Sequence, residues 1–551
     1  MLDLDTVRDI LIELGIVEAG IADVLSPQFD TTSPMIGAFR AASHAVGRVF
    51  IATLTGAGRD EQRAIATAAI EKLNAIASAD LPDMIGVGTP EGYAYYALYP
   101  EQYAAAATDI VHSIAPTAAV CIGVRGIGTS LSAAVSATLE RHGCAVRSYT
   151  VRPHGHPFDR QIKLSPELER ELTSRRDALF LVIDEGPGLS GSSFAGVANA
   201  LTSLGIEDDR IVLMPSWMPD GSRFVSDAAR ARWRRHRKVA YTFEEQLMRN
   251  DRLASGFGAG ADLVDLSAGA WRDRVFSDRL AWPVVQPQHE RRKYLLDGAG
   301  RAPILLKFAG LGRIGRAKRV RAERIAAAGF GPAPIDLQHG FLATEMLQAK
   351  PLSTADVNQS VIDRMSDYLA FVGREFAATT TSARDKLSDM IQVNTREALG
   401  DAASSTVTRF MRTRAVFGER PVALDGRMLP HEWLRSGETL IKTDATDHHD
   451  DHFFPGTQDI AWDVAATAVE LRLDDPAERY LLERYIAASG DWHIAERVPF
   501  YRVAYLAHRV GYATLASEAL DESDDRIRWC AQASVYRNQL RGALAQMSNA
   551  A

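Results

Sequence analysis

Two adjacent carboxylates followed by a loop of glycine and serine form the stretch of this sequence best suited to chemistry. An apolar run at 179–183 ends at Asp184 and Glu185, and a helical pattern begins at Phe194. The intervening loop would present backbone N–H groups and small hydroxyls at the start of a helix, where anions bind. The two acids could accept hydrogen bonds from vicinal sugar hydroxyls. The segment therefore predicts a sugar-phosphate site, with a glycine-rich strand-to-helix turn that binds no ligand as the alternative.

A second glycine loop lies upstream and also carries groups suited to phosphate. A short apolar run at 120–124 ends at Arg125, and a helix rich in Ala and Leu follows at 131–139. Glycines in such a turn allow the backbone to approach a ligand closely. The candidate phosphate ligands of this loop are Gly126, Gly128, Thr129 and Ser130.

The segment at 151–163, between the two loops, is rich in cations and histidines. Pro and Gly interrupt it, which argues against a regular element. Such a segment could cover a substrate and exclude water from the reacting sugar. A surface loop with scattered charges is the alternative. The candidate residues of the cover are Arg152, His154, His156, Arg160 and Lys163.

The three segments together resemble the type I phosphoribosyltransferases, in which a pyrophosphate loop, a mobile hood and a PRPP loop follow one another in this order. The resemblance implies that Asp184 and Glu185 hold the ribose hydroxyls and favour the developing positive charge, with Arg125 as the third catalytic residue. It also implies that Mg²⁺ and the first loop stabilise departing pyrophosphate. The reaction would transfer phosphoribose from PRPP to a nucleophile, or run in reverse as a cleavage. The implied ligands of the 5-phosphate are Gly186, Gly188, Ser190, Gly191, Ser192 and Ser193.

A lysine within an apolar strand marks the second half of the chain. Lys307 lies in the run at 304–308, and an ammonium there needs an anion because burying it alone is costly. A basic helical segment with Glu323 follows, and then further strand-like pieces. This arrangement resembles the small lobe of the aminoglycoside phosphotransferase and choline kinase-like group. It implies that Lys307 holds the phosphates of ATP and that Glu323 holds Lys307.

Two aspartates further along resemble the catalytic loop and the metal ligand of the same group. Asp425 is the candidate base and Asp444 the candidate metal ligand at the end of the next strand. The expected Asn after the base is absent, and Pro430 or His431 takes its place, which puts phosphoryl transfer in question. His431 is therefore a second metal-ligand candidate. Residues 456–465 resemble the helix start whose acids brace the catalytic loop.

Six consecutive potential metal ligands occupy residues 447–452, in the order Asp, His, His, Asp, Asp, His. A zinc or other transition-metal site is one interpretation. Adjacent ligands cannot all point at one ion, however, and the run follows Asp444. We favour a polar loop that flanks a magnesium site.

Composition bounds the remaining possibilities. The chain has 551 residues, which predicts two or three domains, and its net charge of −8 argues against nucleic-acid and membrane partners. A basic run at 230–238 could bind nucleic acid, but a surface helix paired with acids is favoured. Three scattered cysteines predict no disulfide framework, and the absence of an apolar span or signal start predicts a cytoplasmic protein.

We therefore expect an α/β protein with a type I phosphoribosyltransferase-like parallel sheet domain followed by a bilobal protein-kinase-like domain. The predicted boundaries are a helical extension at 1–35, the first domain at 36–275, a linker at 276–288 and the second domain at 289–551. The expected function is PRPP-dependent phosphoribosyl transfer coupled to ATP-dependent phosphorylation of a small molecule, with Mg²⁺, PRPP and ATP required. The alternative is a sensor of PRPP or nucleotide with a non-catalytic kinase-like module. A homodimer is left open.

Overall fold

The computed structural model describes the whole chain except residues 1–2, 189, 223, 249–250, 259–261, 299–301, 382–383, 414–417, 452 and 550–551. The chain forms two compact units. The first comprises residues 1–259 with 310–316 and 338–340, and the second comprises 260–309, 317–337 and 341–551. None of the helices described is both long enough and apolar enough to cross a membrane.

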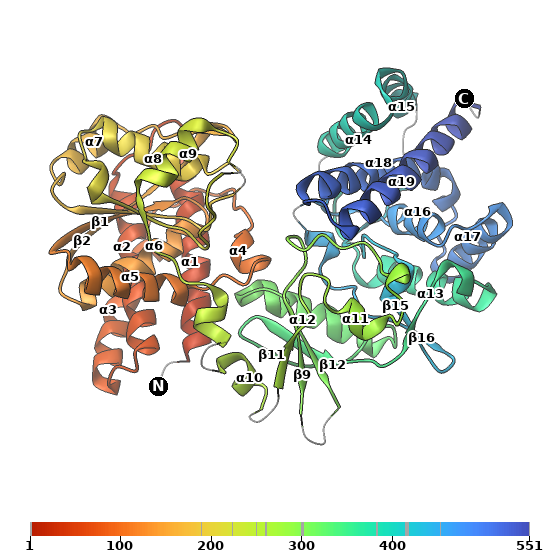
Figure 1. Ribbon diagram of the computed structural model, residues 1–551, viewed down its shortest axis with the longest axis horizontal. Coiled ribbons are helices and arrows are strands. Elements are labelled where there is room, and N and C mark those ends of the chain that lie inside the picture. Colours follow the sequence, from red (N-terminus) through yellow and green to blue (C-terminus); the bar gives the residue numbers. More distant parts are fainter. Residues whose placement is uncertain are drawn as a thin grey trace. The chain divides into compact units, whose positions relative to one another are not determined.

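A five-stranded sheet forms the centre of the first unit (Figure 1). Its neighbouring strands are all parallel and follow the order β2-β1-β5-β6-β7. Continuous apolar runs suit such strands because helices cover both faces of a parallel sheet, and the runs predicted at 120–124 and 179–183 are confirmed as parts of β1 and β5. The strands are β1 (Ala118–Val124), β2 (Ala145–Val151), β5 (Leu179–Ile183), β6 (Ile211–Met214) and β7 (Arg237–Lys238).

Helices cover both faces of this sheet. Helices α7, α8 and α9 pack on one face, where Val120, Phe180 and Trp233 share a buried cluster, and α5 and α6 cover the other (Figure 1). The helices of this unit are α1 (Leu4–Leu25), α2 (Pro34–Leu54), α3 (Arg59–Ala77), α4 (Glu91–Ala94), α5 (Pro100–Ile114), α6 (Ile127–Arg141), α7 (Pro166–Thr173), α8 (Ser192–Ser203), α9 (Asp227–Arg235) and α10 (Arg252–Gly256).

The N-terminal helices extend further than predicted. Helices α1, α2 and α3 pack on one another and on α6, and their buried residues form one cluster with those of α6. The helical extension predicted at 1–35 therefore continues to Ala77, and the sheet begins only at Ala118. The amphipathic pattern continues through α2 and α3, and it does not mark where the sheet domain begins.

Most of the basic run at 230–238 lies in the surface helix α9, as favoured from the sequence, and its last two residues form β7. Arg232 and Arg235 both form ion pairs with Asp208, at 2.8 and 2.9 Å. Arg230 pairs with Asp227 within the helix α9 itself. The positive charges are thus compensated by acids of the same unit.

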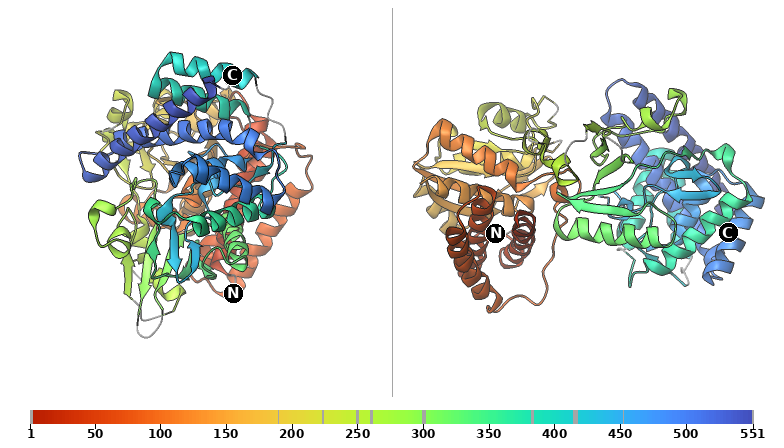
Figure 2. Two further views of the ribbon diagram at one scale, coloured as in Figure 1. Left: turned by 90° about the vertical axis from the view of Figure 1, so that its right-hand side faces the viewer. Right: turned by 90° about the horizontal axis from the view of Figure 1, so that it is seen from below.

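The second unit begins with a five-stranded antiparallel sheet in the order β11-β12-β10-β9-β8. Helix α12 (Gly312–Ala327), which belongs to the second unit from Ala317 onward, follows the third strand along the chain, and Ala322 in this part packs near Leu342 of the sheet (Figures 1 and 2). The strands are β8 (Asp262–Asp265), β9 (Lys293–Asp297), β10 (Ile304–Phe308), β11 (Pro334–Gln338) and β12 (Phe341–Glu345).

Helices dominate the rest of the second unit. Two of its strands, β15 and β16, form an antiparallel hairpin. The elements are α11 (Arg272–Val275), β13 (Lys350–Pro351), α13 (Gln359–Glu375), α14 (Arg384–Leu399), α15 (Asp401–Thr413), β14 (Pro421–Val422), β15 (Trp433–Ser436), β16 (Thr439–Lys442), β17 (Gln458–Asp459), α16 (Ala461–Glu470), α17 (Asp475–Ser489), α18 (Ile494–Ala519) and α19 (Asp524–Asn549).

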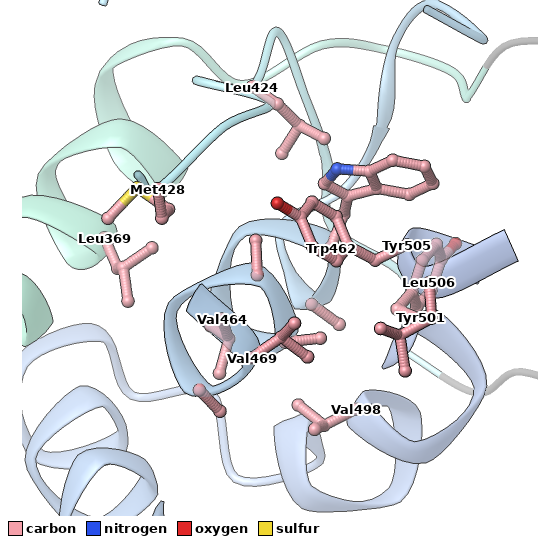
Figure 3. Close-up of a cluster of buried hydrophobic side chains, with 14 of the residues drawn as sticks. Leu369, Leu424, Met428, Trp462, Val464, Val469, Val498, Tyr501, Tyr505 and Leu506 are labelled. Atoms are coloured by element: carbon pink, nitrogen blue, oxygen red, sulfur yellow. The ribbon is translucent and has the colours of Figure 1, made fainter. Parts of the chain in front are cut away.

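The core of the second unit fixes the loop that carries Asp425. Leu424 and Met428 flank this loop in the sequence, and both are fully buried in the cluster that also contains Trp462 and Tyr505 (Figure 3). Burying a leucine or methionine side chain contributes about 2 kcal/mol. The loop is therefore held at both ends by apolar packing.

The boundary between the units differs from the prediction. Strand β8 pairs with β9, so the second sheet begins inside the range predicted for the first domain. The predicted linker at 276–288 is packed in its second half, where Val285 and Gln286 are buried and the indole N–H of Trp529 donates to the carbonyl of Val285 at 3.0 Å, whereas residues 277–281 are exposed. Proline and a change of pattern indicated a linker, but the segment at 266–292 is a long connection between two strands of one sheet.

Candidate functional site

The two predicted ligand loops of the first unit lie at one edge of its sheet. Strand β1 lies next to β5 and is also the partner of β2, so the chain turns in opposite directions from the carboxyl ends of β1 and β5. In open α/β sheets, ligands bind at such a topological switch point. The loop after β1 leads into α6, and the loop after β5 leads into α8. The structure therefore brings the two loops together.

Asp184 and Glu185 lie half-buried at the end of β5. Tyr103 donates its hydroxyl to the backbone carbonyl of Asp184 at 2.6 Å, and the backbone N–H of Gly92 donates to Glu185 Oε2 at 2.7 Å. Burial raises the pKa of Asp184 to about 7. Burial and the neighbouring charge of Asp184 raise the pKa of Glu185 to about 8. Among the residues that the structure describes, no lysine or arginine forms an ion pair with either carboxylate, so the pair would be stabilised by a cation or by hydroxyl donors.

The loop after β5 ends at the N-terminus of the twelve-residue helix α8. The hydroxyls of Ser190 and Ser192 lie 2.9 Å apart, and Ser192 also donates to the carbonyl of Pro157 at 2.7 Å. Ser192 therefore links this loop to the predicted cover, and Gly186 accepts a hydrogen bond from Ser216 N–H at 2.9 Å. Of the other predicted phosphate ligands, Gly188 is exposed, Gly191 precedes the helix and Ser193 lies in its first turn, while Leu189 is outside the described residues.

The side chains predicted to hold pyrophosphate are occupied within the protein. Arg125 is buried, and its guanidinium lies 2.5 Å from Asp30 and 3.1 Å from Asp23. Ser130 shares a hydrogen bond of 2.8 Å with the hydroxyl of Tyr93. Thr129 is fully buried, and its hydroxyl has no hydrogen-bond partner among the described residues. The predicted side-chain contacts of Arg125 and Ser130 with pyrophosphate are therefore corrected, because acids of the N-terminal segment and Tyr93 take their place.

The glycines of the same loop have structural reasons for their positions. Gly126 has φ +120°, which only glycine adopts readily, and it precedes α6. A Cβ on Gly128 would lie 2.5 Å from the carbonyl oxygen of Ile183. The close approach predicted between Gly128 and a ligand is thus made instead between Gly128 and the neighbouring strand. The backbone N–H groups of the loop stay the candidates for an anion.

The predicted cover is a hairpin rather than an irregular segment. Strands β3 (His154–His156) and β4 (Asp159–Gln161) pair antiparallel, because Gly155 at φ +87° and the turn at 157–158 allow the chain to reverse. Arg152 is anchored at its base by Asp23, 3.0 Å from Nε, and Arg160 donates to the carbonyl of Gly155 at 2.8 Å. His156 and Lys163 are exposed, and His154 is half-buried.

In the second unit, Lys307 on β10 contacts two carboxylates of the loop after β16. Its Nζ lies 2.5 Å from Asp444 Oδ1 and 3.0 Å from Asp447 Oδ1. Burial alone would lower the pKa of Lys307, but the two carboxylates outweigh burial and raise it. The anionic partner that a strand lysine requires is therefore supplied by these two aspartates.

Glu323 does not hold Lys307, which corrects the prediction. Its carboxylate is exposed and pairs with Arg319 one turn earlier, at 2.9 Å. The inward face of α12 instead presents cations: Lys318 pairs with Asp450 at 3.3 Å, and Arg321 donates to the carbonyl of Ala445 at 2.8 Å. Glu323 lies on the opposite face of the helix from these two residues.

Asp425 is enclosed rather than presented to a substrate. It is fully buried, and its Oδ2 accepts from Tyr368 at 2.6 Å and lies 3.3 Å from Lys442 Nζ. Burial would raise its pKa, but Lys442 and His448 outweigh burial and lower it. The role of Asp425 as a base that contacts the acceptor is not supported by this geometry, because neighbours occupy its carboxylate oxygens.

The acids of the 456–465 segment brace this loop, as the resemblance implied. Asp463 accepts from the backbone N–H groups of Asp425 and Gly426 at 2.8 and 2.9 Å. Asp459 accepts from Ala461 N–H at 2.7 Å at the start of α16. These two aspartates therefore position the loop and the helix.

His431 is displaced from the metal-ligand position predicted for it. Its ring stacks on Trp271 with a centroid distance of 6.0 Å, and burial lowers its pKa to about 3. The next residue in the chain, Glu432, points into the carboxylate cluster and contacts Lys442 Nζ at 2.6 Å. Among the described residues, Glu432 thus belongs to a group of potential metal ligands, and His431 does not.

The run at 447–452 contributes to the site through its first two residues. Asp444, Asp447 and His448 offer ligand atoms within 4.8 Å of one another, and Asp425, Glu432 and His448 form a second such group. Burial would lower the pKa of His448, but Asp444 and Glu432 raise it to about 9. His452 lies outside the described residues, and Asp450 pairs with Lys318.

Carboxylate oxygens are the ligands that Mg²⁺ prefers, and Asp444 and Asp447 of the first group offer such oxygens. Asp444 and Asp447 would hold it, and the ion would neutralise the phosphates of a nucleotide. Glu432, Lys442 and Tyr368 were not predicted from the sequence. Lys442 carries the same signal as Lys307, a lysine at the end of an apolar strand, and this signal could have identified it.

A cavity of about 220 Å³ lies within the second unit next to these groups. Lys307, Asp444 and Asp447 line it on one side. Residues of the connector after β12, among them Met346, and of the 266–292 segment, among them Trp271, line it elsewhere. The cavity therefore joins a cationic and acidic cluster to apolar walls, which is the composition of a small-molecule site.

No protein family model and no curated protein matches the chain. Solved structures resemble it in part. Choline kinase LicA from Streptococcus pneumoniae is 16% identical over 45% of this chain and 89% of that chain, with a TM-score of 0.34. A choline/ethanolamine kinase family protein from Mesorhizobium loti is 14% identical over 50% and 97%, with a TM-score of 0.34. Macrolide 2'-phosphotransferase MphH from Brachybacterium faecium is 14% identical over 53% and 98%, with a TM-score of 0.35.

Proposed function

We propose that the second unit binds a magnesium nucleotide and transfers its terminal phosphoryl group to a small molecule. The observation that carries this proposal is the contact of Lys307, on the third strand of the antiparallel sheet, with Asp444 and Asp447 at one side of a cavity. A strand lysine beside a metal-binding aspartate is the arrangement that holds nucleotide phosphates in kinases.

Each group has a role in this proposal. Lys307 exchanges part of its contact with the aspartates for the phosphates of ATP, and Asp444 with Asp447 holds Mg²⁺. The ion neutralises charge on the phosphates when it is bound. Glu432 takes the position of the missing Asn as an additional oxygen ligand, supported by its place in the second group of ligand atoms.

The test is a calorimetric titration of the full chain with ATP and Mg²⁺. Lys307→Ala should weaken binding at least tenfold, because it removes a charge-assisted contact to phosphate. Lys350→Ala is the matched control, since Lys350 is largely exposed in the same unit. Undetectable ATP binding by the unaltered protein at millimolar nucleotide would refute the proposal.

The enclosure of Asp425 favours a second candidate, a nucleotide-binding module without turnover. A base must reach the proton that it removes, and the Asp425 carboxylate is already bonded to Tyr368, Lys442 and His448. ATP binding without phosphoryl transfer to any acceptor, including the phosphorylated and carboxylated sugars considered below, would favour this module over the phosphotransferase.

For the first unit we propose a site for PRPP, with phosphoribosyl transfer or the reverse cleavage as its reaction. Two observations support this site. Asp184 and Glu185 lie at the topological switch point, and neither has an ion-pair partner among the described residues. The backbone of the loop before α8 would receive the 5-phosphate.

PRPP with Mg²⁺ should raise the melting temperature of the full chain, because a ligand at a hundred times its dissociation constant adds about 2.7 kcal/mol of stability. Asp184→Asn combined with Glu185→Gln should remove this shift. The control is Asp60→Asn combined with Glu61→Gln, an adjacent pair of exposed acids on α3. A shift that survives in the Asp184 and Glu185 variant would place PRPP elsewhere.

A further inference from the structure

One wall of the cavity in the second unit is built from two arginines and a tyrosine. Arg427 comes from the loop after Asp425, and Arg509 and Tyr512 come from α18. Each guanidinium lies 5.7 Å from the centroid of the Tyr512 ring. The two positive groups thus flank one aromatic ring at the cavity surface.

The acidic side chains that line the cavity near this wall already have cationic partners. Asp451 lies 3.1 Å from Arg427, and Glu290 lies 2.7 Å from Lys293 and accepts from the Trp271 indole at 2.6 Å. These carboxylates therefore offer little attraction to a positively charged ligand.

Arg509 is different, because its hydrogen-bond partner is a neutral hydroxyl. Its Nε and Nη2 donate to Tyr536 at 3.2 and 3.1 Å, while an oxygen of Glu470 is 3.7 Å away. That carboxylate also accepts from Tyr536 at 2.8 Å and from Tyr505. Glu470 is thus shared between three groups, and Arg509 keeps positive charge for the cavity.

The chemistry of this wall is that of an anion site. A guanidinium presents a planar fork of N–H donors that matches phosphate and carboxylate oxygens. A ligand amine placed here would instead meet the like charges of Arg509 and of Arg427, which Asp451 compensates in part, and this is unfavourable at low dielectric. Tyr512 and the nearby Trp529 add apolar faces against which a sugar ring can pack.

We propose that this wall binds the acceptor of the phosphoryl group, and that the acceptor carries a phosphate or a carboxylate. This inference rests on the function proposed for the second unit. A sugar phosphate satisfies it, and a phosphoribosyl compound, the product proposed for the first unit, belongs to that class. The first unit would then supply a substrate that the second unit consumes.

The test is a calorimetric titration of the full chain with D-ribose 5-phosphate, D-ribonate and D-ribose. The first two compounds separate phosphate from carboxylate recognition, and the third lacks a charge. The titrations use protein that carries Asp184→Asn and Glu185→Gln, so that binding to the first unit is suppressed. We expect one of the anions to bind at least tenfold more tightly than ribose.

Arg427→Gln should weaken this binding at least tenfold, and Arg427→Lys should recover part of it because the charge returns without the fork. Arg479→Gln, an exposed arginine on α17, is the matched control and should have no effect. Equal binding of ribose and both anions, no anion binding at millimolar concentration, or binding unaffected by Arg427→Gln would each overturn the inference. MgATP binding is measured separately, so failure of the nucleotide site would be seen independently.

Discussion

At the scale of residues, the first unit keeps two carboxylates where their charge is disfavoured. Asp184 and Glu185 have raised pKa values of about 7 and about 8 because they are buried at the end of a strand. A carboxyl whose pKa is raised on folding stabilises the native state below its unfolded pKa, and this contribution is lost as the pH rises through the folded pKa. Such a cost is typical of positions retained for ligand binding.

We predict that Asp184→Asn combined with Glu185→Gln makes the unliganded protein more stable at high pH. The amides cannot ionise, so the advantage should be small near pH 4 and grow to about 2 kcal/mol near pH 8, after allowance for solvent screening. Urea denaturation at a series of pH values measures it. An advantage that is constant with pH would mean that the two carboxylates do not titrate as described.

For Asp425 we predict the opposite effect, namely that its substitution destabilises the protein. It is buried beside Lys442 and His448, and its removal leaves the charge of Lys442 compensated by Glu432 alone, which is unfavourable in a buried cluster. Asp425→Asn should therefore destabilise the second unit by about 3 kcal/mol in urea denaturation. Asp401→Asn, at the exposed start of α15, is the control. A variant as stable as the unaltered protein would show that Asp425 is available to act on a substrate.

The sequence predicted part of this chemistry at residue level. Lys307 and Asp444 lie in contact, as the resemblance to the kinase-like group implied, and burial explains why the strand lysine needs an anion. The role predicted for Glu323 was wrong because the basic sequence of α12 does not indicate which face of the helix turns inward. The role predicted for Arg125 was wrong because its partners, Asp23 and Asp30, lie about a hundred residues away in the sequence.

At the scale of elements, the segment at 266–292 is the main departure from the predicted organisation. It connects β8 to β9, lines the cavity and is fastened to α19 by Arg272, whose guanidinium lies 2.7 and 2.9 Å from the two oxygens of Asp525. Proline and tryptophan suggested a linker. The local sequence does not show that this segment packs on a helix more than two hundred residues later in the chain.

We predict that trypsin does not cut first within 276–288, although Arg279 lies there. Trp529→Phe removes the hydrogen bond to Val285, worth about 1 kcal/mol, and should speed cleavage in this segment about fivefold. Trp492→Phe is the control, since Trp492 is 76% exposed. Equal cleavage in both variants, or first cleavage at 276–288 in the unaltered protein, would contradict the packing described.

At the scale of the whole molecule, the α/β class and a parallel-sheet unit that precedes a second unit were predictable. Apolar runs of the length of strands, each followed by a glycine loop and a helix, indicate a parallel sheet. The boundary was missed because β8 is short and only half-buried, and its four residues have no strong pattern. The length of the N-terminal helical layer was missed because helical periodicity does not show what a helix packs against.

Because the two units have separate cores, we predict that the full chain unfolds on heating in two transitions. PRPP with Mg²⁺ should raise one of them and MgATP the other, because each ligand stabilises only the unit that binds it. Differential scanning calorimetry of the full chain measures both. A single transition raised by either ligand would show that the two units unfold as one.

The most direct test of the central claim is a crystal structure of the full chain with Mg²⁺ and a non-hydrolysable ATP analogue. We predict the triphosphate in the cavity of the second unit, with a phosphate oxygen within hydrogen-bonding distance of Lys307 Nζ and the metal ion on Asp444 and Asp447. An analogue bound away from Lys307, or a metal ion held without either aspartate, would contradict the account.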